Sequence, residues 1–391
     1  MLNTPFSPWP SFTHEEADAI SAVLLSNKVN YWTGTECRDF EAEFAKWTGT
    51  EYAIALANGT VALEVALKAL GVSEGDEVVV TSRTFLASAS SIVTVGAVPV
   101  FADVDPDSQN ITAESIQAVL SKKTKAIICV QLAGWPCEMD SIMALANKND
   151  LFVVEDCAQA HGAKYKSRSV GSIGHIGTWS FCQDKVMTTG GEGGMVTTND
   201  RDLWSKMWSY KDHGKSWEAV YNREHPPGFR WLHDSFGTNW RMTEMQAAIG
   251  RIQLKRMADW TEKRQLNAKM IWAGGCQFDA LRVPEVPDYI EHAAYKCYLF
   301  VRPEKLKTGW DRDRIMNNII ELGVPCFSGS CSEVYLEKAF DNTGWRPIER
   351  LPVAKELGET SLMFLVHPTL THDEIAKTIR VLQQVMVLAS K

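Results

Sequence analysis

The sequence predicts an α/β protein with a mostly parallel sheet, made of a large domain followed by a smaller one. Over residues 52–198, short apolar runs alternate with stretches of helical periodicity. Strands separated by helices of this length are typical of right-handed crossovers in a parallel sheet. The length of 391 residues favours a second domain, because one hydrophobic core rarely serves so long a chain. We expect a large domain over residues 1–256 and a smaller α/β domain over residues 257–391.

The expected elements follow from periodicity and from capping residues. An extended arm over residues 1–14 should lead into a helix near Thr13 and a second helix over 39–47. Strands are then expected over 52–56, 77–81, 99–104, 125–132, 151–154, 177–182 and 195–198, and helices over 61–70, 84–95, 112–120 and 139–147. A long helix should begin after Thr243 and run through 257 or beyond. Pieces of a smaller α/β unit should lie at 296–303 and 349–366, with a closing helix over 371–388.

Residues 214–236 show no clear period and are rich in charge, Trp, His, Pro and Gly. A long loop in a compact domain is often functional. We expect either a lid or dimer contact here, or a plain surface loop.

Composition excludes several classes of function. The chain is 45% hydrophobic and 23% charged, with a formal net charge of −8 and a pI of about 5.7. An acidic balance argues against nucleic acid or an anionic membrane as the main partner. No apolar run approaches the roughly 18 residues that span a bilayer, and the first ten residues do not resemble a secretory signal. Nine cysteines without a C-x-x-C pair favour reduced thiols in the cytoplasm, and the nine histidines show no metal-binding spacing.

Three polar residues lie at or near the ends of two expected strands. One strand ends in Asp156, and another ends near Ser180 and Lys185. Adjacent parallel strands would bring them to one edge of the sheet, where open α/β sheets bind ligands. A Schiff-base lysine, an acid for a pyridinium nitrogen and a hydroxyl for a phosphate are the parts of a pyridoxal phosphate site. Taken one by one, these residues are more often a surface lysine and capping groups.

Two glycine-containing segments flank this set. Gly59-Thr60 opens a helix, where amide groups attract phosphate, although the pair is also an ordinary helix start. The cluster over 190–194 follows the lysine and opens no helix, so we interpret it as a tight turn beside the ligand and not as a dinucleotide-binding loop.

The motifs EDCAQAHGA (155–163), SFCQDK (180–185) and TTGGEGGM (188–195) resemble the DegT/StrS-type sugar aminotransferases. The resemblance continues through ANGTVALEVALKALGVSEGDEVVV (57–80) and GTNWRMTEMQAAIG (237–250). It implies pyridoxal phosphate enzymes of fold type I. In such enzymes a large domain carries a mostly parallel mixed sheet flanked by helices, and a smaller C-terminal α/β domain follows.

The resemblance also implies roles for individual residues. Lys185 would form the Schiff base, and Asp156 would hold the ring nitrogen protonated. The remaining positions are Gln159 near the ring oxygen, Phe85 stacked on the ring, Gly59, Thr60 and Ser180 on the phosphate, Asn239 on the phosphate of a partner subunit, and Arg241 and Tyr295 near the substrate. A shared site of this kind requires a homodimer. Glu155 is expected at the surface or an interface, without a role.

The implied activity is transfer of an amino group from L-glutamate to a nucleotide-diphosphate-linked keto-(deoxy)hexose, for cell-surface or specialised glycans. C4 is favoured over C3. Family members that dehydrate sugars carry histidine at position 185, so Lys185 favours amino transfer. The alternatives are a dehydratase or lyase on the same fold and a non-catalytic sensor. Gln131, Phe364-Leu365 and 182–184 depart from the common pattern and are expected to touch the sugar pocket.

Overall fold

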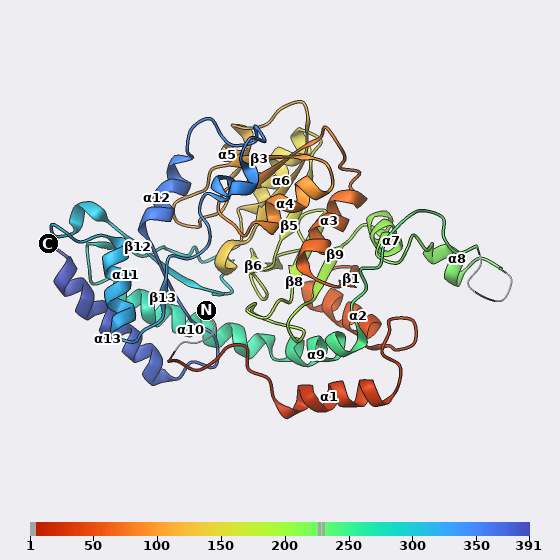
Figure 1. The fold of residues 1–391 in the computed structure, drawn as a ribbon, viewed down its shortest axis with the longest axis horizontal. Helices are drawn as coiled ribbons and strands as arrows, with labels where there is room; N and C mark the ends of the chain where they lie inside the picture. The colour runs from red at the N-terminus through yellow and green to blue at the C-terminus, as the bar shows by residue number, and fades with distance from the viewer. Residues whose placement is uncertain (1–4, 226–227, 229–230) are drawn as a thin grey trace.

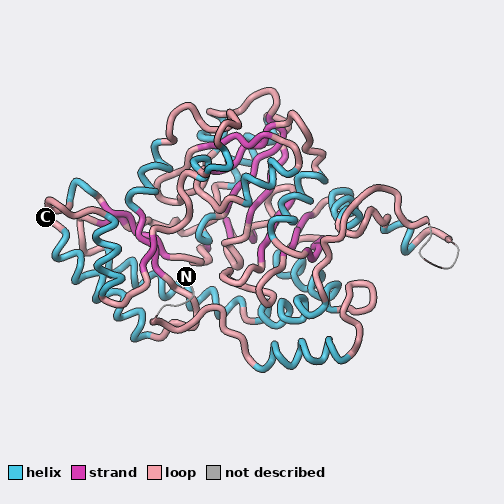
Figure 2. The backbone as a smooth tube through the Cα atoms, in the orientation of Figure 1, coloured by secondary structure: helices cyan, strands magenta, loops and turns pink. Residues whose placement is uncertain are grey.

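The computed structural model describes residues 5–225, 228 and 231–391. Its centre is a seven-stranded sheet (Figures 1 and 2). In spatial order the strands are β1 (Tyr52–Leu56), β9 (Gly194–Thr198), β8 (Ile176–Ser180), β5 (Phe152–Asp156), β4 (Thr124–Val130), β2 (Glu77–Thr81) and β3 (Val98–Ala102). The five strands from β8 to β3 are parallel, and β9 runs antiparallel to both β8 and β1. The expected mostly parallel mixed sheet is confirmed.

Helices connect and cover the strands of this sheet. They are α2 (Glu36–Thr48), α3 (Gly59–Ala69), α4 (Ala87–Thr94), α5 (Ala113–Gln117), α6 (Met139–Lys148) and α7 (Arg201–Tyr210). Helix α3 packs across β8 and β9, and α2 lies against β1. The strands are apolar because both of their faces are covered: the side chains of Val78, Val79 and Val80 are all fully buried.

The helix expected over 84–95 begins later than its periodicity suggests, at Ala87. The preceding residues pair with a distant segment instead. The Thr84 amide donates to the Cys331 carbonyl (3.1 Å), and the Val334 amide donates to the Ser82 carbonyl (2.9 Å). These non-local bonds hold residues 82–84 as a loop at the carboxyl end of β2.

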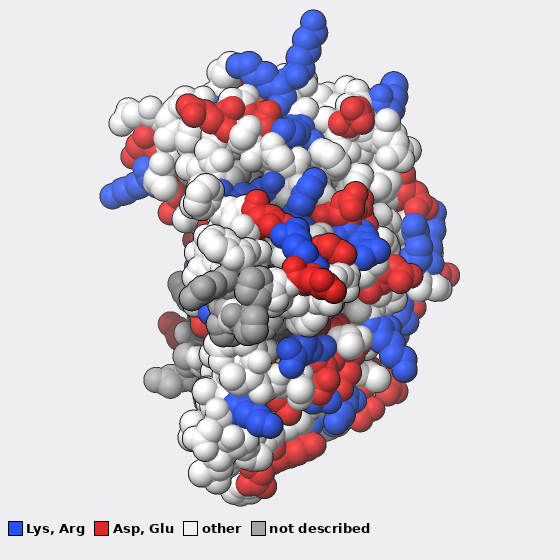
Figure 3. Space-filling model, turned by 90° about the vertical axis from the view of Figure 1, so that its right-hand side faces the viewer, with Lys and Arg blue, Asp and Glu red and all other residues white. Residues whose placement is uncertain are grey.

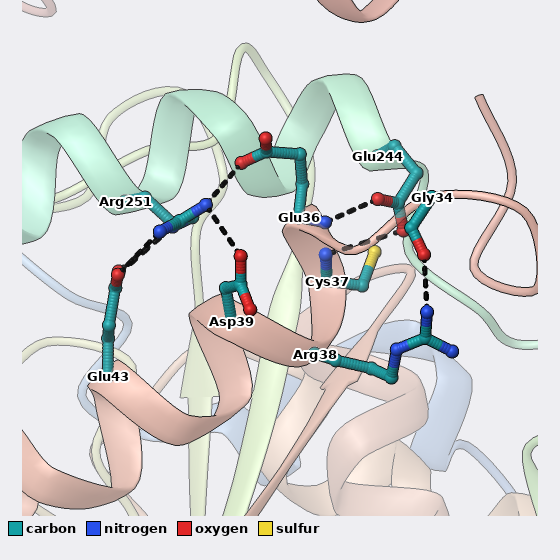
Figure 4. A network of polar contacts seen from close by, with 8 residues as sticks. All are labelled: Gly34, Glu36, Cys37, Arg38, Asp39, Glu43, Glu244 and Arg251. Atoms are coloured by element: carbon teal, nitrogen blue, oxygen red, sulfur yellow. Dashed lines mark hydrogen bonds and ion pairs between the residues drawn. The ribbon is translucent and has the colours of Figure 1, made fainter. Parts of the chain in front are cut away.

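A network of charges fixes α9 (Glu244–Lys255) to the start of α2 (Figure 4). The Glu244 carboxylate accepts hydrogen bonds from the amides of Glu36 (2.5 Å) and Cys37 (3.3 Å), which are unpaired at a helix start. On the same face, Arg251 binds three carboxylates, those of Glu36, Asp39 and Glu43. Helix α2 is thereby positioned, and its half-buried Glu41 accepts from the Ala55 amide of β1 (2.9 Å).

The expected long helix after Thr243 is in fact two helices. Thr243 and Gln246 form a reciprocal cap at the start of α9. Arg256 separates α9 from α10 (Met257–Gly275), and its side chain binds Glu15 and Glu16 of α1 (His14–Leu25). The chain then enters the C-terminal part.

A smaller four-stranded sheet lies in the C-terminal part (Figure 1). Its strands, in spatial order, are β10 (Leu281–Arg282), β12 (Cys297–Val301), β14 (Ser361–Phe364) and β13 (Cys326–Phe327), and its helices are α11 (Arg312–Glu321), α12 (Pro352–Thr360) and α13 (His372–Ala389). Thr371 caps α13 as expected, in a reciprocal pair with Glu374. A three-stranded sheet of β11 (Ile290–Glu291), β6 (Lys164–Tyr165) and β7 (Arg168–Ser169) joins the two parts. The domain boundary at residue 256 stays a prediction, because Tyr298, Tyr335 and Leu357 pack into the core of the larger sheet.

The described residues of the segment 214–236 lie at the end of the molecule next to α7, where α8 (Trp217–Tyr221) projects from the body (Figures 1 and 2). The sequence did not predict this short helix. Trp231 and Phe236 are exposed by 75% and 98%. The lid and dimer-contact hypotheses extend over residues 226–227 and 229–230, which lie outside the described residues.

Charges of both signs are mixed on the face that carries this segment (Figure 3).

Among the described residues, none of the helices combines the length and the apolar content needed to cross a membrane. All nine cysteines are free. Within the same described part of the chain, His, Cys, Asp and Glu side chains nowhere gather in threes that could hold a metal ion.

Three buried histidines should make folding sensitive to acid. Burial lowers the pKa of His161, His292 and His367 to about 3, with nearby cations contributing for His161 and His367. Below about pH 6.5 these histidines are protonated in the unfolded chain but not in the folded chain. The free energy of unfolding therefore keeps its full value above about pH 6.5 and decreases as the pH falls below it. At pH 5.5 each of these histidines should lower the free energy of unfolding by about 1.4 kcal/mol.

We expect His161→Phe to relieve one of these three losses, because its ring lies between the rings of Trp179 and Phe181. Urea unfolding of the cofactor-free protein at pH 7.5 and 5.5 should show the variant losing about 1.4 kcal/mol less than wild type. The same change at the exposed His372 is the control. Equal losses for wild type and His161→Phe would contradict this account.

Candidate active site

The carboxyl ends of β5 and β8 bring the three predicted residues together. The two strands are parallel neighbours, with Asp156 opposite Thr178. Ser180 is the last residue of β8, and a turn closed by the Lys185 amide on the Cys182 carbonyl (3.0 Å) follows it. Lys185 acts electrostatically on Asp156. The structure therefore brings Asp156, Ser180 and Lys185 to one edge of the sheet, and their roles stay predictions.

Asp156 is buried, with a relative exposure of 5%, and its two oxygens have different partners. One accepts from the Ser88 hydroxyl (2.8 Å), and the other accepts from the Ala158 amide (3.1 Å). Burial raises the pKa of Asp156, while Ser88, the Ala158 amide and Lys185 oppose that rise. An ionised carboxylate in a buried place is stabilised by a nearby cation, so a protonated ring nitrogen of a ligand would suit it.

Lys185 is half-buried beside an aromatic ring. Its Nζ lies 5.6 Å from the centre of the Tyr295 ring, and the Tyr295 hydroxyl donates to Asp184 (2.7 Å). Burial would raise the pKa of Asp184, but Lys185 and the Tyr295 hydroxyl together bring it below its usual value. The predicted substrate residue Tyr295 thus lies next to the predicted catalytic lysine.

The start of α3 and the end of β8 form a narrow cradle. A Cβ atom added to Gly59 would lie 2.6 Å from the Cβ of Ser180, so only glycine fits without a shift. The first amides of a helix have no carbonyl partner within it, and the Asn58 side chain caps one of them, the Val61 amide (3.0 Å). The amides of Gly59 and Thr60, the exposed Thr60 hydroxyl and the Ser180 hydroxyl suit a phosphate.

Phe85 and Gln159 complete the surroundings of a ring-shaped ligand. Phe85, just before α4, is 69% exposed, which is unusual for a phenylalanine between two buried segments. Gln159 is buried, and its carbonyl oxygen accepts from the Ala133 amide (2.9 Å). Its NH₂ group is then the end available to donate to a ligand oxygen.

Asn239 and Arg241 lie in a segment that runs beside residues 210–212 and the end of β1. Asn239 is exposed. Arg241 donates to the buried Asp212 carboxylate (2.7 Å), which also binds Lys215. Arg241 therefore forms a salt bridge in this structure, and its role at the substrate stays a prediction.

These residues suit pyridoxal 5′-phosphate. Only glycine fits at position 59 in the cradle, and the Asp156 carboxylate and the Lys185 amine lie at the same edge of the sheet. Lys185 would hold the cofactor covalently, Asp156 would meet its ring nitrogen, and Gly59, Thr60 and Ser180 would hold its phosphate.

Comparison with known proteins agrees with this geometry. Residues 10–383 match the DegT/DnrJ/EryC1/StrS aminotransferase family. The chain belongs to this family.

The relatives include enzymes of sugar metabolism and a solved structure. The chain is 34% identical over 370 residues to GDP-perosamine synthase of Escherichia coli O157:H7, covering 94% of each protein. It is 35% identical to a UDP-N-acetyl-3-dehydro-α-D-glucosamine 3-aminotransferase of Acidithiobacillus ferrooxidans, covering 93% of this chain and 92% of that one. The crystal structure of an aminotransferase from Psychrobacter cryohalolentis superposes with a TM-score of 0.97 at 66% identity, covering 98% and 99% of the two chains.

Two sequence interpretations outside this aminotransferase site are wrong. Glu155 is not at a surface: it is fully buried and accepts from the amides of Gly171 (2.9 Å), Ile173 (2.8 Å) and Gly174 (2.7 Å). Successive side chains of a strand point to opposite faces, so Glu155 anchors a loop on the face away from Asp156. Gln131 donates to Glu155 (3.0 Å) in this buried cluster, and Phe364 is buried in the smaller core, so both side chains are closed off from a sugar ligand. The expectation for Leu365 and residues 182–184 stays a prediction.

The sequence interpretation also missed cations around Lys185. The Nζ atom of Lys296 lies 4.6 Å from the centre of the same Tyr295 ring, and the buried Arg264 of α10 donates to the Tyr295 carbonyl (3.5 Å). Burial lowers the pKa of Lys296 to about 8, with Arg264 and Lys185 adding to the effect and Asp184 opposing it. A lone lysine at the start of the apolar run of β12 was the signal for it.

Gly59→Ala should weaken cofactor binding, because its Cβ would displace Ser180 or the first turn of α3. We expect at least a tenfold loss of affinity for pyridoxal 5′-phosphate, of the order of one or two lost phosphate hydrogen bonds. Calorimetric titration of the cofactor-free protein measures it. Gly358→Ala in α12 is the matched control, and unchanged affinity in Gly59→Ala would refute the cradle.

Proposed function

We propose that this family member is a pyridoxal 5′-phosphate-dependent aminotransferase that moves an amino group from L-glutamate to a nucleotide-diphosphate-linked keto-(deoxy)hexose. The observation that carries the proposal is the meeting of Lys185 and Asp156 at one sheet edge beside the Gly59–Ser180 cradle. The sugar-nucleotide names of two relatives support the acceptor class.

When bound, pyridoxal 5′-phosphate supplies a ring that withdraws electrons from the Cα atom of the donor. The protein does the rest. Lys185 would hold the cofactor, and its free amine would carry the proton of the donor's Cα atom. Asp156 would keep the ring nitrogen protonated, and Phe85 would cover one face of the ring.

The cluster beside Tyr295 suits an anionic substrate. Lys185, Lys296 and Arg264 bring three positive charges together, and the carboxylates of Asp184 and Asp156 offset two of them. A donor with two carboxylates and an acceptor with a diphosphate both need such charge.

We favour amination at C4 of the sugar, which the GDP-perosamine synthase relative supports. The 3-aminotransferase relative makes C3 the second candidate. NMR of the product formed from 4-keto and 3-keto nucleotide sugars decides between them.

Incubation with L-glutamate tests amino transfer directly. We expect stoichiometric conversion of bound cofactor to pyridoxamine 5′-phosphate, followed by its loss when the keto-sugar is added. Lys185→Ala should lower turnover by at least 10³-fold, because it removes both the covalent anchor and the proton carrier. A dehydratase or lyase would form no pyridoxamine 5′-phosphate, and a sensor would show no turnover.

We also propose a cytoplasmic homodimer in which Asn239 completes the partner's site, and mixed dimers test this. A dimer of one Lys185→Ala subunit and one Asn239→Ala subunit would contain one site with both native residues. Random mixing of two inactive variants should then restore about a quarter of wild-type activity. If Asn239 served its own subunit, every mixed site would carry one defect and activity would stay absent.

A further inference from the structure

A chain of hydroxyl groups leads to the Asp156 carboxylate from the loop before α4. The Ser88 hydroxyl donates to Asp156 (2.8 Å), and the Thr84 hydroxyl lies 2.8 Å from that of Ser88. A hydroxyl has one hydrogen, and an ionised carboxylate can only accept. Ser88 therefore gives its hydrogen to Asp156, and Thr84 must donate to Ser88.

Both hydroxyls are buried, with exposures of 1% for Thr84 and 2% for Ser88. The Thr84 amide is tied to the Cys331 carbonyl, and the adjacent Arg83 side chain binds Gln109 (2.9 Å) and Ser361 (2.9 Å). The loop that carries the Thr84 hydroxyl is thus bonded to the C-terminal part, and the Ser88 hydroxyl at the other end of the series donates to the Asp156 carboxylate. Hydrogen bonds in such a chain polarise one another and strengthen.

Few other groups act on this carboxylate. Among the described residues, Lys185 is the charged side chain that does so, and the Ala158 amide is the second donor. Glu155 faces the amides of Gly171 and Gly174 on the other side of β5. The Cys157 thiol stays neutral, since burial and both acids raise its pKa well above its usual value.

We propose that Ser88 is a positioning residue: its hydroxyl, with that of Thr84 behind it, keeps the negative charge on Asp156 and the proton on the ring nitrogen of the cofactor. The inference rests on the proposed cofactor and is independent of the sugar substrate. A carboxylate that accepts fewer hydrogen bonds is more basic. Without Ser88, the proton moves from the ring nitrogen towards Asp156, and the ring becomes neutral.

The visible absorbance of the resting holoenzyme reports this change. A positive ring nitrogen disfavours the proton on the nearby nitrogen that links Lys185 to the cofactor, and a neutral ring removes that repulsion. Ser88→Ala should therefore move the pH midpoint of the absorbance change upward. We expect a shift equivalent to a threefold to tenfold change in the proton dissociation constant, of the order of one ordinary hydrogen bond, because only part of the effect on Asp156 reaches the linking nitrogen.

Two matched variants separate this role from simple packing. Ser91→Ala removes a buried hydroxyl from the same helix, one that donates only to the Ser88 carbonyl (3.3 Å), and should leave the midpoint unchanged. Ser88→Thr keeps a hydroxyl and should restore the wild-type midpoint. If Ser88→Ala fails to fold, the nearly isosteric Thr84→Val removes the donor to Ser88 and should move the midpoint in the same direction by a smaller amount.

Affinity for pyridoxal 5′-phosphate, measured calorimetrically on cofactor-free protein, is the second readout. It should fall about threefold to tenfold in Ser88→Ala, because the pair between the carboxylate and the ring nitrogen loses charge. A wild-type midpoint in Ser88→Ala, or an equal shift in Ser91→Ala, would overturn the inference. A shifted midpoint with no reaction towards glutamate would instead uphold Ser88 and refute the proposed activity.

Discussion

The Asp156 carboxylate is buried at the end of β5, and the arrangement of the site depends on how its charge is met. An ionised acid in such a place is costly unless donors and a cation surround it. The chain supplies the Ser88 hydroxyl, the Ala158 amide and the nearby Lys185, which come from three separate stretches of sequence. The parallel pairing of β5 with β8 makes the meeting possible, because it ends both strands at the same edge.

The C-terminal part supports this edge although it supplies none of the predicted cofactor contacts. Arg83 links the loop before α4 to Ser361 of β14. The indole of Trp9 donates to the Lys185 carbonyl (2.8 Å) and lies against Trp260, His367 and Arg264. Ser7 binds Glu374 of α13. The loops that carry Phe85 and Lys185 are therefore both tied to the smaller sheet and its helices.

Periodicity was enough to predict the strands of the larger sheet, most within a few residues, because strands buried on both faces are short apolar runs. It failed where distant segments decide the local structure. Residues 82–84 leave the helical pattern to pair with 331–334, and Arg256 interrupts the helix after Thr243 to bind α1. Glu155 was misread because a charged residue in a sequence gives no sign of the amides that will surround it. Lys185 and Asp156 could be predicted because strand ends meet at one edge, whereas Ser88, Lys296 and Trp9 reach the site through packing alone.

The central claim is that the amine of Lys185 carries the cofactor, and reductive trapping tests it most directly. Borohydride treatment of the holoenzyme, followed by proteolysis and mass spectrometry, identifies the lysine that bears the phosphopyridoxyl group. The account predicts that the label lies on Lys185 in the peptide that contains SFCQDK. A label on Lys296, or on any lysine away from the edge of β5 and β8, would contradict it.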